Sequence, residues 1–220
     1  MSKKYLILGI LGFTLILFLS ELIYIVHNRP EFLLRYYINR VEVKYKNSQV
    51  KEALEYIDNI AKLRESEVVQ YYPDIEWLLR VELPDIEMDE KLEQELEQLM
   101  SQVDLNKIYE DKQKLVVLFY RIGLIGSRYQ KKDLVEYALK KTIVLDPEWS
   151  FFHRELANYY LVKGKKKDAW DILKFCEEFK YSKNACKEYF EDQYESGEVL
   201  PIGFYEERIY EYLDFYDKSD

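Results

Sequence analysis

The segments FYRIGLIGSRYQKKDLVEYAL, residues 119–139, and HRELANYYLVKGKKKDAWDIL, residues 153–173, repeat each other at a spacing of 34 residues. Matched positions are similar in size and polarity. Phe119, Ile122, Gly123, Gln130, Val135 and Leu139 correspond to His153, Leu156, Ala157, Gly164, Ala169 and Leu173. A period of this length is typical of a helix–turn–helix unit, which cannot bury its apolar face alone and must stack on a neighbour. The repeat therefore predicts stacked helical hairpins, and such stacks mostly bind other polypeptides.

The later segment resembles a tetratricopeptide repeat. The residues that carry the resemblance are Leu156, Ala157, Tyr160, Gly164, Ala169 and Leu173. The earlier segment departs from the pattern where Gly126 replaces a large aromatic residue and Gln130 replaces the turn glycine. A degenerate third match runs from Tyr37 to Ile57, out of phase with the other two. The resemblance implies a solenoid of helical hairpins in which the first helix of each pair lines a concave face.

Residues 5–26 form an apolar run interrupted only by Thr14, Ser20 and Glu21. About 20 apolar residues cross a bilayer as a helix. A cleaved signal peptide is the alternative, but Phe18 and Ser20 fit poorly with the small residues of a cleavage site. We therefore expect a single-pass anchor in the cell membrane. Basic residues flank both ends of the run. A short basic N-terminus with Lys3 and Lys4 commonly stays in the cytoplasm, so an extracytoplasmic domain is expected, with a cytoplasmic one as the alternative.

The fold predicted from the sequence is all-α, with an N-terminal transmembrane helix followed by a tetratricopeptide-like solenoid of helical hairpins. Low glycine and proline contents, 7 and 5 residues, fit an all-helical chain. The expected divisions are a membrane anchor over 1–28, a degenerate hairpin over 29–66, an irregular helical segment over 67–114, two repeats over 115–183 and capping helices over 184–220.

The net charge of −9 makes nucleic acid an unexpected partner, because an acidic surface repels phosphates. A protein or peptide partner is expected instead. Carried over from the resemblance, the concave face predicts seven partner-binding residues: Tyr120, Leu124, Arg128, Phe151, Arg154, Asn158 and Leu161. Mixed aromatic, polar and basic side chains of this kind suit an extended or helical peptide. Some of them could instead complete the core.

The sequence offers little that is typical of an enzyme. Its two histidines, His27 and His153, have no carboxylate or cysteine at metal-ligand spacing, and no glycine-rich phosphate loop occurs. We therefore expect no catalytic site, no metal and no cofactor. Cys176 and Cys186 fall across a predicted short turn, so they could form a disulfide or remain two buried thiols.

Two functions fit these features. The first is a membrane-anchored interaction module that recruits or scaffolds a protein or peptide. The second is an accessory structural subunit of a larger membrane complex. A mixed polar and aromatic concave face favours the first.

Overall fold

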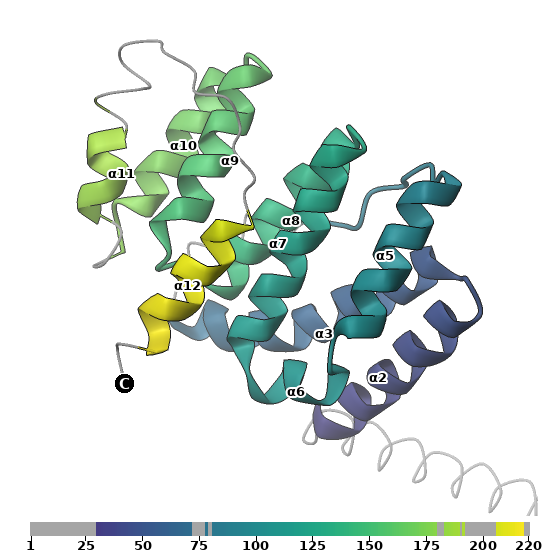
Figure 1. Ribbon diagram of the computed structural model, residues 1–220. Helices are drawn as coiled ribbons and strands as arrows, with labels where there is room; N and C mark the ends of the chain where they lie inside the picture. Colours follow the sequence, from purple (N-terminus) through teal and green to yellow (C-terminus); the bar gives the residue numbers. More distant parts are fainter. Residues whose placement is uncertain are drawn as a thin grey trace, which may run out of the picture.

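The computed structural model describes residues 30–71, 78, 81–179, 183–189, 191 and 206–217. All of its regular elements in these ranges are helices (Figure 1). In chain order they are α2 (Pro30–Lys46), α3 (Val50–Tyr71), α5 (Glu90–Gln102), α6 (Leu105–Glu110), α7 (Lys112–Arg128), α8 (Lys132–Leu145), α9 (Ser150–Val162), α10 (Lys166–Cys176), α11 (Lys183–Tyr189) and α12 (Glu207–Asp217).

Three antiparallel hairpins, α2/α3, α7/α8 and α9/α10, close with the same kind of turn. One residue in each turn has a left-handed backbone, with φ of 52° at Ser48, 57° at Gln130 and 72° at Gly164. Glycine adopts this conformation without strain, whereas a glutamine does so at a cost. The repeated positions Gln130 and Gly164 therefore have the same conformation although their residue types differ.

Backbone hydrogen bonds hold these turns in place. In each turn an amide bonds to the carbonyl five residues earlier, as in a Schellman motif. The bonds are Gln49 N to Lys44 O at 2.9 Å, Lys131 N to Gly126 O at 2.8 Å and Lys165 N to Tyr160 O at 2.8 Å. The second and third bonds are 34 residues apart in the chain, so the sequence period is also the period of the turns.

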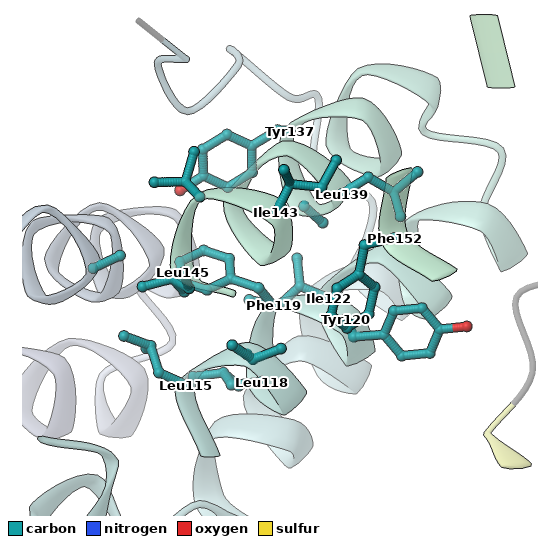
Figure 2. Close-up of a cluster of buried hydrophobic side chains, with 14 of the residues drawn as sticks. Leu115, Leu118, Phe119, Tyr120, Ile122, Tyr137, Leu139, Ile143, Leu145 and Phe152 are labelled. Carbon is teal, nitrogen blue, oxygen red and sulfur yellow. The ribbon is translucent and has the colours of Figure 1, made fainter. Parts of the chain in front are cut away.

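The hairpins stack through a continuous apolar core. α8 contacts α9 and α3, and α5 packs on α7. Phe119 of α7 and Tyr137 of α8 meet edge to face, with ring centroids 5.9 Å apart (Figure 2). At Gly126 an added Cβ would lie 3.2 Å from the Leu134 side chain. The glycine at this departure from the repeat pattern therefore lets α7 and α8 approach closely.

A buried ion cluster joins the first hairpin to the second. Lys141 of α8 is 1 % exposed, and its Nζ lies 2.8 Å from Asp58 and 2.6 Å from Glu65, both on α3. The Tyr137 hydroxyl also donates to Asp58, at 2.7 Å. Burial raises the pKa of Glu65, whereas at Asp58 burial is outweighed by Lys141, so the pKa falls below its ordinary value. The cluster fixes where α3 crosses α8.

A disulfide links the end of α10 to α11. It joins Cys176 and Cys186, whose Cα atoms are 6.1 Å apart, and both side chains are buried. The bond ties the short helix α11 to the last hairpin.

The predicted fold class requires a correction. Among the described residues, no helix is both long enough and apolar enough to cross a membrane. α3 has the length, with 22 residues, but charged residues such as Lys51, Asp58 and Lys62 recur along it. The predicted anchor over residues 5–26 lies outside the described residues.

Replacing Lys141 by methionine should lower the free energy of unfolding by about 3 to 5 kcal/mol, because Asp58 and Glu65 would stay buried without their cation. Chemical denaturation at neutral pH measures the change. Lys62→Met is the matched control, since Lys62 pairs with the same Asp58 but its side chain is 48 % exposed. That exposed pair should contribute under about 1 kcal/mol. Equal losses in the two variants would contradict the importance of the buried cluster.

Candidate functional site

The face formed by α7 and α9 carries a cluster of aromatic side chains. Tyr120 of α7 lies against Phe151 and Phe152 of α9, with ring centroids 6.0 and 5.7 Å apart. All three rings are buried. The first helices of two hairpins, α7 and α9, thus contribute to one aromatic cluster.

The C-terminal helix α12 covers this surface (Figure 1). Tyr212 is 1 % exposed and lies between Trp149 and Phe152, at centroid distances of 5.5 and 5.7 Å. Its hydroxyl donates to the Asp146 carboxylate at 2.8 Å. Ile209, three residues earlier on the same face of α12, is also buried. The helix therefore lies with its apolar side on the α7/α9 surface, which we call the aromatic groove.

Charged contacts flank the apolar ones. The Arg208 guanidinium lies 5.1 Å from the Phe151 ring centroid. Arg121 of α7 pairs with Glu206, which immediately precedes α12, at 3.0 Å. These contacts fix the start of α12 along the groove.

The seven partner-binding residues predicted from the sequence lie in three kinds of surroundings. Tyr120, Phe151 and Asn158 are buried. Leu124, Arg154 and Leu161 are half-buried, and Arg128 is exposed. Tyr120 and Phe151 come together beneath α12, so the chain itself occupies much of the predicted face. Their role in binding a partner stays a prediction.

An open cleft of about 330 Å³ adjoins the groove, between α5, α7 and the residue before α12. Its lining residues are Glu95, Gln98, Leu99, Gln102, Arg121, Leu124, Ile125, Arg128 and Glu206. Arg128 pairs with Glu95, which also accepts a hydrogen bond from the Tyr129 hydroxyl at 2.9 Å. No residue of α5 was among the predicted site residues, although Leu92, Leu96 and Leu99, with polar residues between them, have the spacing of a helix with one exposed face.

Burial shifts the pKa of a histidine and of a glutamate in α9. Burial lowers the pKa of His153 to about 4, although a 2.7 Å hydrogen bond between its Nε2 and the Pro147 carbonyl opposes the shift. The neutral imidazole packs against the rings of Phe175 and Phe179, which makes it part of the core. Burial raises the pKa of Glu155 to about 7, despite the positive charges of Arg154 and Arg208. Glu155 is thus the group near the groove that titrates at neutral pH.

Within the described parts of the chain, no group of three histidine, cysteine or acidic side chains could hold a metal ion. The groove and cleft are lined by aromatic rings and by arginine–carboxylate pairs, and tyrosine, tryptophan and arginine are residue types enriched at protein–protein interfaces.

Neither a protein-family model, nor a curated protein, nor a solved structure matches the chain. The resemblance to tetratricopeptide repeats therefore stays a prediction from the sequence.

Glu155→Gln should remove one source of the pH dependence of the native protein's free energy of unfolding. The folded native protein binds a proton at Glu155 between pH 4.5 and about 7 that its unfolded chain releases, so its stability falls as pH rises through this window. The variant lacks this loss and should gain up to about 3 kcal/mol over the native protein by pH 7.5. Urea denaturation at several pH values measures the difference.

Glu87→Gln, which removes the same charge at an exposed side chain, is the control. If the difference between Glu155→Gln and the native protein were the same at every pH, Glu155 would titrate at its ordinary pKa and would not be desolvated in the folded protein.

Proposed function

We propose that this protein is a protein–protein interaction module whose aromatic groove binds an amphipathic helix of a partner. The observation that carries the proposal is the position of α12. This helix already lies in the groove with its apolar face inward. Binding of an amphipathic helix in an apolar groove between other helices is a recurring mode of peptide recognition.

The contacts of α12 define what a partner helix would need. A buried aliphatic residue and a tyrosine three positions later fill the places of Ile209 and Tyr212. The tyrosine hydroxyl reaches the Asp146 carboxylate, and a cation stacks on Phe151 as Arg208 does. A preceding acidic residue pairs with Arg121, as Glu206 does. Aromatic and arginine contacts of this kind dominate many interfaces.

A role as a structural subunit of a larger assembly is the second candidate. One observation favours it: the outer face of α2 exposes three large apolar side chains, Phe32, Tyr36 and Val43, at 56, 50 and 47 %. Their spacing of four and seven residues places them on one side of the helix. A permanent neighbour would cover this face, and its loss on purification would leave the isolated chain prone to associate.

A labelled peptide with the sequence of residues 204–220 tests the groove. Ile209→Asp in the full chain should release α12, because a carboxylate replaces a buried side chain, and so open the groove to the peptide. Fluorescence anisotropy should show at least tenfold tighter binding to this variant than to the native protein. Tyr210→Asp is the control, since Tyr210 is 64 % exposed on the same helix, and it should bind like the native protein.

Circular dichroism must show that both variants keep their helices. Equal peptide affinity for the native protein and Ile209→Asp, with both folded, would contradict a groove that accepts a helix.

A further inference from the structure

Two lysine-rich turns of the chain lie side by side although they are 34 residues apart. The Tyr159 hydroxyl of α9 donates to the Lys132 carbonyl of α8 at 2.7 Å. Lys163, after α9, lies 3.4 Å from Glu136 and 3.8 Å from Asp133, both on α8. The tips of the α7/α8 and α9/α10 hairpins therefore lie next to each other, on the same side of the stack (Figure 1).

The edge formed by these two tips is positively charged in a chain of net charge −9. We call it the lysine edge; its lysines are Lys132, Lys140, Lys163, Lys165, Lys166 and Lys167, and its carboxylates are Asp133, Glu136 and Asp168. The lysines thus outnumber the carboxylates two to one. Lys132, Lys166 and Lys167 are exposed and form no ion pair within the described residues.

One carboxylate at the centre of the edge is shared by three ammonium groups. Glu136 lies 3.0 Å from Lys140, 3.4 Å from Lys163 and 4.0 Å from Lys165, and it accepts a 3.0 Å hydrogen bond from Tyr160. Burial would raise the pKa of Glu136, but the bond from Lys140 and the charge of Lys165 keep it below its ordinary value. The local excess of positive charge favours a further carboxylate.

Aromatic rings position the lysines and extend the surface. The Lys163 ammonium is 4.3 Å from the Tyr159 ring centroid, and that of Lys165 is 5.4 Å from Tyr160. Trp170 is 42 % exposed and lies one helical turn after Lys166, on the same face of α10. The edge thus combines ammonium groups of fixed position with an open apolar platform.

We infer that the lysine edge binds an acidic segment of a partner protein, with an aliphatic or aromatic side chain of that segment on Trp170. Packed helices lie about 10 Å apart, and an extended peptide advances about 3.3 Å per residue. Carboxylates at about every third position would therefore reach successive hairpin tips. A nucleic acid fits less well, because the acidic remainder of the chain repels a long run of phosphates. The inference is independent of the aromatic groove.

A labelled twelve-residue peptide, with glutamate at every third position and leucine and serine between, is the probe. Lys166→Glu/Lys167→Glu should weaken its binding at least tenfold in fluorescence anisotropy. Lys91→Glu/Lys112→Glu is the matched control, because it makes the same change in net charge at exposed lysines of α5 and α7. The control should weaken binding less than threefold.

Trp170→Ala should weaken binding of this peptide but not of one with leucine replaced by serine.

Equal weakening by the two double variants would overturn the inference, because binding would then reflect net charge alone. It would also be overturned if the native protein bound a twelve-nucleotide thymidine oligomer more tightly than the peptide, or bound neither. The glutamate peptide should bind the native protein and the Ile209→Asp protein equally well, because Ile209 lies outside the lysine edge, so failure of the edge and failure of the groove are distinguishable.

Discussion

A helical hairpin buries one side of its two helices and leaves another that something else must cover. The whole architecture depends on this constraint. α8 covers its open side with α3 and α9, and the buried Lys141 cluster fixes the crossing with α3. In the part of the chain that the structure describes, α12 rather than a further hairpin covers the aromatic side of α7 and α9. The groove is thus the apolar surface of the stack that is covered by a helix from outside the repeated hairpins.

How firmly α12 holds this place decides whether a partner can enter. Burying a side chain such as Ile209 or Tyr212 contributes about 2 kcal/mol. Because α12 belongs to the same chain, its effective concentration at the groove is of the order of millimolar. A separate helix must bind tightly enough to outcompete it, so affinity measured on the intact chain understates affinity for the open groove. Burial raises the pKa of Glu155 to about 7, so a charge that acts on Arg208 of α12 changes near neutral pH.

The period of the sequence was enough to predict hairpins, because the matched small and apolar residues recur with the turns. It did not predict a left-handed Gln130, since bonds from neighbouring amides hold that residue there. It could not place Lys141 in the core, because its partners lie 76 and 83 residues earlier. The sequence period also could not predict where α12 packs. Tyr212 looks like any apolar residue of an amphipathic helix, and its contact with Asp146 spans 66 residues.

The central claim is that α12 lies on the aromatic face of α7 and α9 in the isolated protein. Nuclear Overhauser effects between the ring protons of Tyr212 and those of Trp149 and Phe152 test it most directly. The ring centroids are 5.5 and 5.7 Å apart, so we expect strong cross-peaks from Tyr212 to both residues. A folded protein without these cross-peaks, in which the Tyr212 ring is accessible to solvent, would contradict the claim.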